Sequence, residues 1–188
     1  MRWIDKNFRS DMFVRFAMTF ELLGELKGRT LLDIGCGSGP YVLEAFRRGA
    51  ARVTALDPAS RMLDLVRQRL AGTDYLRRCN LIEGSFPGVE LAAHDHAIVM
   101  GVMDYVADPE DFLKALRAVV GMSAAISFPS KHWLRTPPRK FRYYLRKCPV
   151  YFYDEPRIRQ LAEASGFGGV AVRKIAGAGM DYHVFLKP

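Results

Sequence analysis

Hydrophobic residues recur along this chain in two patterns, one typical of helices and one typical of buried strands. Residues 1–28 show the helical pattern, with apolar side chains at three- and four-residue steps and Gly28 as the expected C-terminal cap. The apolar members of this stripe are Met12, Phe13, Phe16, Phe20, Leu23 and Leu26. We expect this helix to pack across an edge of the sheet that the following residues predict.

Short apolar runs then alternate with amphipathic stretches, which is the pattern of repeated βαβ units. The runs predicted as strands are Leu31–Ile34, Arg52–Leu56, Asn80–Glu83, Asp95–Met100 and Ala124–Phe128. The helices predicted between them are Tyr41–Arg48, Ser60–Leu70 and a helix that Asp108 caps, which runs from Pro109 to about Val120.

The last part of the chain closes this arrangement. Asp154 is expected to cap a helix that ends at Gly166. Val170–Ile175 and Tyr182–Leu186 then predict an antiparallel hairpin. The sequence therefore predicts an α/β fold, with one doubly wound, mostly parallel seven-stranded sheet, helices on both faces and an antiparallel C-terminal hairpin. The 188 residues suit a single domain, 1–188.

Composition narrows the class of protein. No apolar run approaches the ~20 residues that cross a bilayer, and no signal-peptide pattern opens the chain. The three cysteines, Cys36, Cys79 and Cys148, are scattered, odd in number and without metal-type spacing. They indicate a reducing, cytoplasmic location and predict no metal site.

The basic residues are concentrated in one stretch. The net charge is +8, and residues 131–147 hold seven basic residues and no acidic one. Aromatic residues are interleaved with them. This stretch is either a site for an anionic substrate or partner, or a solvated basic helix with an apolar underside. The binding reading assigns substrate contacts to Lys131, Trp133, Arg135, Arg139, Arg142, Tyr143 and Tyr144.

The most specific motif follows the first predicted strand. Residues 33–39 read D-x-G-x-G-x-G, a glycine turn that lets a ligand lie against the main chain near a helix N-terminus. The dinucleotide fingerprint G-x-G-x-x-G fits poorly, because Pro40 stands where its third glycine falls. The motif resembles motif I of the class I S-adenosylmethionine (SAM)-dependent methyltransferases, whose fold is Rossmann-like.

This resemblance implies a SAM site, with S-adenosylhomocysteine as product. Asp57, at the end of the second strand, takes the role of ribose acceptor, although it is also placed to cap the next helix. Family members often carry an acid where Ser85 stands, so Ser85 and a stacking Phe86 replace that adenine contact. The implied cofactor residues are Asp33, Gly35, Cys36, Gly37, Gly39, Asp57, Pro58, Met62, Ser85, Phe86, Met100, Gly101 and Tyr105.

The loop after the fourth strand resembles the motif IV region of small-molecule methyltransferases, with Tyr105 in place of the usual His. It lacks the Pro-Pro-aromatic motif of enzymes that methylate nucleic-acid amines. The predicted catalytic residues are His132, as general base, and Tyr105; Asp104 and His183 are weaker candidates. In the same family, the segment before the first strand (1–28) covers the site and the connection after strand five (131–153) forms a substrate lid.

The sequence thus predicts methyl transfer to a small molecule, through an oxygen of an anionic or lipid-linked acceptor. Two alternatives stay open: an RNA methyltransferase, and a non-catalytic SAM-binding module recruited through the basic stretch. Nucleic acid and a peripheral contact with an anionic membrane are the alternative partners, and the oligomeric state is not encoded in any pattern we recognise.

Overall fold

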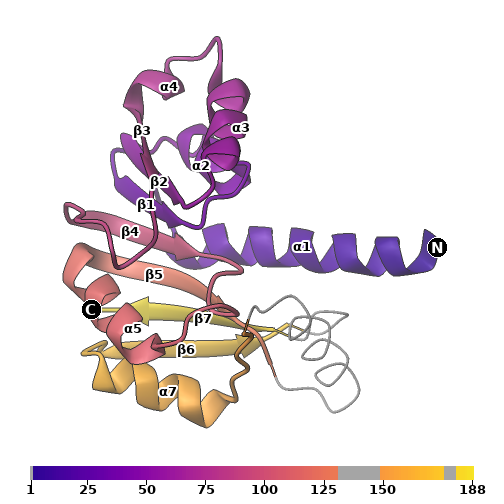
Figure 1. The fold of residues 1–188 in the computed structure, drawn as a ribbon, viewed down its shortest axis with the longest axis vertical. Helices are drawn as coiled ribbons and strands as arrows, with labels where there is room; N and C mark the ends of the chain where they lie inside the picture. Colours follow the sequence, from indigo (N-terminus) through magenta and orange to yellow (C-terminus); the bar gives the residue numbers. More distant parts are fainter. Residues whose placement is uncertain (1, 131–148, 176–180) are drawn as a thin grey trace.

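The computed structural model describes residues 2–130, 149–175 and 181–188, with side chains from residue 13 onward (Figure 1). Seven strands form one sheet in the order β3-β2-β1-β4-β5-β7-β6. The strands are β1 (Thr30–Ile34), β2 (Arg52–Asp57), β3 (Cys79–Glu83), β4 (His94–Val99), β5 (Val120–Phe128), β6 (Gly169–Lys174) and β7 (Tyr182–Lys187). The helices are α1 (Arg2–Leu23), α2 (Pro40–Arg47), α3 (Ser60–Leu70), α4 (Tyr75–Arg78), α5 (Pro109–Val119) and α7 (Glu155–Ala164).

The pairing of the strands confirms the predicted fold class. All pairs among β1 to β5 are parallel, whereas β7 pairs antiparallel with both β5 and β6. From β1 the sheet continues to β2 and β3 on one side and to β4 and β5 on the other, so the strand order reverses between β1 and β4. In open α/β sheets ligands bind outside the carboxyl ends of the strands at this point.

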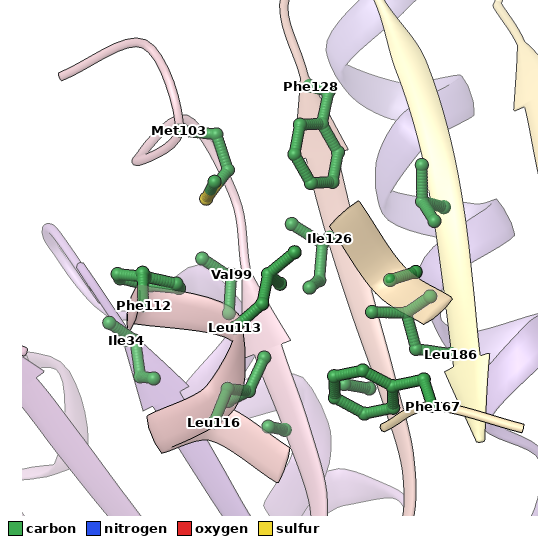
Figure 2. Packing of buried hydrophobic residues seen from close by; sticks show 14 of the residues in the cluster. Ile34, Val99, Met103, Phe112, Leu113, Leu116, Ile126, Phe128, Phe167 and Leu186 are labelled. Carbon is green, nitrogen blue, oxygen red and sulfur yellow. The ribbon is translucent and has the colours of Figure 1, made fainter. Parts of the chain in front are cut away.

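The core lies in two layers, one on each face of the sheet. Neighbouring strand residues point to opposite faces, so Leu31 packs under α1, α2 and α3 while Leu32 packs under α5 and α7. Figure 2 shows the second layer, in which Leu113 and Leu116 of α5 lie over β1, β4 and β5. Both layers hold side chains that are almost fully buried, which fixes the sheet between its helices.

Several boundaries differ from the predicted ones. The first helix ends at Leu23 because Gly24 takes a left-handed conformation (φ 75°) and donates its N–H to the carbonyl of Phe20 at 3.2 Å. β5 begins at Val120, four residues before the predicted start, because Val120 pairs with His94 across an irregular register. The short helix α4 was not predicted.

Both predicted N-terminal helix caps are confirmed, whereas Gly28 caps no helix because α1 has already ended at Leu23. Asp108 Oδ1 accepts the Asp111 N–H at 3.0 Å, and Asp154 Oδ1 accepts the Arg157 N–H at 3.1 Å. Within the described residues, no helix combines the length and the apolar character needed to span a membrane.

Candidate active site

A cavity of about 560 Å³ opens at the carboxyl ends of four parallel strands. The segments that follow β1, β2, β3 and β4 form most of its wall, and the first turn of α5 closes one side. Its lining residues are Ile34, Gly35, Leu56, Asp57, Pro58, Gly84, Ser85, Phe86, Pro87, Gly101, Val102, Tyr105, Val106, Ala107, Asp108, Asp111 and Phe112. The cavity therefore lies at the reversal of strand order.

The glycine turn is packed on one side and open on the other. Gly35 has φ 70°, and a Cβ there would collide with the side chain of Val102. A Cβ on Gly39 (φ 76°) would lie 2.9 Å from Cγ2 of Val66. Around Gly37 (φ 51°), by contrast, nothing lies within 4 Å of a built Cβ. The turn thus needs glycine for its backbone and leaves room for a ligand at Gly37.

Asp57 ties the end of β2 to this turn. Its Oδ2 accepts the N–H of Gly37 and its Oδ1 accepts the N–H of Ala59, both at 2.9 Å. A carboxylate has about four acceptor positions, so two remain for a ligand in the cavity. The same side chain therefore shapes the turn and offers acceptors beside it.

Asp33 lies beneath the turn and is 1% exposed. Its Oδ2 has no hydrogen-bond partner among the described residues. Burial, together with the charge of Asp57, raises the pKa of Asp33 to about 8. A buried carboxyl group without a partner is a site where an added cation would favour the ionised form.

The opposite wall is aromatic. The rings of Phe86 and Phe112 meet edge to face, with centroids 5.0 Å apart, and both line the cavity. Phe112 is 1% exposed and belongs to the core, so it fixes the position of Phe86. This wall provides flat apolar surface suited to a heterocyclic base.

The loop after β4 is held from two sides. Gly101 donates its N–H to Ser127 Oγ at 2.8 Å, and the N–H of Tyr151 is donated to the carbonyl of Asp104 at 2.9 Å. Tyr105 lines the cavity from this loop and is 46% exposed. The returning chain at Tyr151 therefore lies against the loop that carries Tyr105.

Comparison with known proteins identifies the fold and the domain. Residues 31–122 match the family described as methyltransferase domain, and this match includes the glycine turn, Asp57 and the loop with Tyr105. Residues 31–122 therefore carry a methyltransferase domain, and the chain as a whole has the fold of the class I SAM-dependent methyltransferases.

Solved structures share the architecture of this methyltransferase domain. A putative S-adenosylmethionine-dependent methyltransferase from Listeria monocytogenes superposes with a TM-score of 0.78 at 16% identity, covering 97% of this chain and 99% of that one. Magnesium protoporphyrin IX methyltransferase from Synechocystis PCC 6803, crystallised with bound SAH, gives 0.75 at 18% identity, covering 98% and 85%. At these identities the likeness establishes the fold.

Curated relatives match only part of their own length. A tRNA U34 carboxymethyltransferase from Actinobacillus pleuropneumoniae serotype 3 is 38% identical over 119 residues, which are 61% of this chain and 36% of that protein. The enzyme of the same name from Haemophilus ducreyi is 37% identical over a stretch of the same length. The chain thus spans about a third of the length of these relatives.

The methyltransferase domain brings together part of the predicted cofactor set. Seven of its residues line the cavity: Gly35, Asp57, Pro58, Ser85, Phe86, Gly101 and Tyr105. Six do not line it: Asp33, Cys36, Gly37, Gly39, Met62 and Met100. Asp33 is buried beneath the turn, Cys36 and Gly39 are buried within it, and Met100 packs against the layer under α1, α2 and α3.

Most of the predicted catalytic and substrate residues cannot be placed in the cavity. His132 and the predicted substrate residues Lys131, Trp133, Arg135, Arg139, Arg142, Tyr143 and Tyr144 lie outside the described residues. His183 is fully buried in β7, 3.0 Å from Thr19 Oγ1, and lines no part of the cavity. Burial lowers its pKa to about 4. Its place in the core makes it unsuitable as a general base.

Sequence reasoning missed the α5 side of the cavity. Asp108 was predicted as a cap at the end of the loop that lines the site, but Asp111 and Phe112 were not singled out; all three line the cavity. These residues follow the carboxyl end of β4 closely in the sequence, and this closeness could have predicted that they line the site. Across the part of the chain that the structure describes, no group of three His, Cys, Asp or Glu residues is arranged to hold a metal.

Proposed function

We propose that this protein transfers the methyl group of SAM to an anionic small-molecule acceptor. The observation that supports it best is the pair of hydrogen bonds that Asp57 accepts from Gly37 and Ala59. They leave two acceptor positions of the carboxylate available to a ligand, next to the open space at Gly37. A dinucleotide would place its pyrophosphate at this turn, where the carboxylate of Asp57, which accepts the N–H of Gly37, would oppose it. SAM carries no phosphate.

The residues present fit SAM in three respects. Asp57 provides acceptors for the ribose hydroxyl groups, and the aromatic wall around Phe86 provides a surface for the adenine. The unpartnered Oδ2 of Asp33 favours a cationic group above the turn, as the amino group of SAM is. Bound SAM supplies a methyl group already activated by the sulfonium, so the protein's main work is alignment and exclusion of water.

The acceptor side of the proposal is based on the charge of residues 131–147 and on the described residues that flank them. Ser130 and Tyr153 pair as a parallel bridge, and Tyr153 donates its N–H to the carbonyl of Pro129 at 2.9 Å. In sequence, the seven basic residues of 131–147 lie between Ser130 and Tyr151, and the N–H of Tyr151 is donated to the carbonyl of Asp104, next to Tyr105. We propose that 131–153 binds the anionic acceptor, that His132 or Tyr105 accepts a proton from a hydroxyl acceptor, and that residues 1–28 cover the site within one domain, 1–188.

RNA is the second candidate acceptor, and it is favoured by the similarity to relatives named tRNA U34 carboxymethyltransferase. Affinity for a nucleic acid falls steeply between low and moderate salt, because counterions are released on binding. Methyl transfer to a transfer RNA that declines with salt in this way would favour RNA, whereas a salt-insensitive activity on small acids would favour the first candidate. The cytoplasmic location stays a prediction from the cysteine usage.

Calorimetry with SAM tests the cofactor assignment. Asp57→Ala and Gly37→Val should each abolish measurable binding, while Asp64→Ala, an exposed carboxylate on α3 that pairs with Arg67, should bind as the wild type does. Normal binding by both site variants would contradict the assignment. Transfer from methyl-radiolabelled SAM to a metabolite extract then tests catalysis, and binding without any transfer would favour the non-catalytic module.

A further inference from the structure

A second cavity, of about 520 Å³, lies at the opposite edge of the sheet. Thr30, Arg52, Cys79 and His94, which begin β1, β2, β3 and β4, all line it. The remaining lining residues are Val53, Thr54, Arg77, Arg78, Asn80, Ile82, Glu90, Leu91, Ala92 and Ala93. All of them belong to the described residues.

Three arginines line this cavity, and one of them has a structural role. Arg78 donates from Nη1 to the carbonyl of Ala50 at 3.0 Å, and its Nη2 pairs with Asp74 at 2.9 Å. Its guanidinium also lies over the rings of Phe46 and Tyr75, 5.2 and 5.3 Å from their centroids. Arg78 therefore anchors α4 against the core and fixes the wall of the cavity.

The other two arginines are available for a ligand. Arg52 and Arg77 are both exposed, and the side chain of neither has a hydrogen bond, ion pair or ring contact with any residue that the structure describes. Glu90 is the only acidic residue among those that line the cavity. Two free guanidinium groups against one carboxylate leave the cavity with a positive balance.

Two other polar lining residues, His94 and Asn80, add no negative charge to the cavity. His94 is held by Thr54 Oγ1 at its Nε2 and by the carbonyl of Ala92 at its Nδ1, both at 2.8 Å. Burial lowers the pKa of His94, so the ring is neutral at pH 7 and takes no part in the charge balance. The side-chain amide of Asn80 is exposed beside the arginines and adds hydrogen-bond donors.

We propose that this cavity binds a phosphate group, carried either by a small phosphorylated compound or by an RNA backbone. The guanidinium group matches phosphate because its donors form a planar fork that bonds two oxygens at once. Arg77, next to Arg78 on α4, and Arg52, at the start of β2, both line this cavity.

This site is separate from the proposed SAM site. The two cavities share no lining residue. Arg52 and Asp57 are the two ends of β2, so they lie ~17 Å apart at the usual rise of a strand. Loss of SAM binding in Asp57→Ala should therefore leave phosphate binding intact, and the two proposals can fail independently.

The test measures the affinity of the full chain for inorganic phosphate and for a short oligouridine RNA. Arg52→Gln and Arg77→Gln should each weaken binding about tenfold, the loss expected for one charge-assisted contact. Glu90→Gln should tighten it a few-fold, since it removes the opposing charge. Arg47→Gln, which removes an exposed arginine of α2 outside the cavity, should change neither affinity.

Both probes are needed to identify the source of the phosphate. Weaker binding of oligouridine in the Arg52 and Arg77 variants assigns the phosphate to RNA, whereas an effect on inorganic phosphate alone assigns it to a small compound. Wild-type protein that binds neither probe, or variants that match Arg47→Gln on both probes, would overturn the proposal. Unchanged thermal unfolding and SAM binding show that the variants fold normally.

Discussion

Replacing Asp33 by Asn should make the ligand-free protein more stable at neutral pH. The pKa of Asp33 is raised to about 8 by burial and by the charge of Asp57, from an ordinary value of 3.8. The folded state therefore keeps the carboxyl protonated at pH 7, while the unfolded state ionises it. Over the 3.2 pH units between 3.8 and 7, this difference costs the folded state about 4 kcal/mol.

Asp33→Asn removes the cost of keeping this carboxyl protonated, but it buries an amide in its place. The amide takes the place of a carboxyl whose Oδ2 already has no described partner, so part of the gain is offset by about 1–3 kcal/mol. The pH dependence separates the two effects, because an amide does not titrate. The stability difference between Asp33→Asn and wild type should grow by about 1.4 kcal/mol per pH unit between pH 4 and pH 8, and then level off.

Urea unfolding of both proteins at several pH values measures this difference directly. Glu83→Gln, which removes an exposed acid at the end of β3, is the matched control. A constant difference from pH 4 to pH 8 would show that Asp33 titrates normally in the fold, and the reasoning would be refuted. Calorimetry adds a second readout: SAM should bind wild type with release of a proton at pH 7, and Asp33→Asn more weakly with none.

The remaining predictions concern the glycine turn and the buried histidine. Gly39→Ala should destabilise the protein by about 2–3 kcal/mol in urea unfolding, because backbone strain at φ 76° adds to the close contact with Val66. Gly37→Ala has φ 51° and open space around the new Cβ, so it should cost about 1 kcal/mol. Equal losses in the two variants would show that the Val66 side chain moves away at no cost. The pKa of His183 is lowered from 6.5 to about 4, so its unfolded form gains a proton first as the pH falls. Between pH 7.5 and 4.5 wild type should lose about 2.5 kcal/mol relative to His183→Gln in urea unfolding, and an equal difference in stability at the two pH values would contradict this.

Much of the fold could be predicted because local patterns and long-range packing agree. The apolar runs of the central strands are buried on both faces, and the caps at Asp108 and Asp154 form within a single turn of their helices. The helix after Gly35–Gly39 and the acid at the end of the second strand were likewise expected. These features depend on residues that are neighbours in sequence.

The errors arose where a boundary depends on distant contacts. Leu26 continues the helical stripe in the sequence, but it is buried in a turn after Gly24 has ended the helix. His183 was considered as a base because histidine is the usual proton acceptor at neutral pH. Its position in β7, between β5 and β6, places it in the core instead, and only strand pairing determines that.

The sequence by itself determined the glycine turn, because D-x-G-x-G-x-G requires a backbone that other residues avoid. It also determined that an acid follows the second strand. Only the tertiary structure decided that Asp57 holds Gly37, that Phe112 supports Phe86, and that three arginines gather at the amino ends of the strands. The reason is physical: the parallel register brings the ends of strands far apart in the chain to common edges, and no local pattern records which residues meet there.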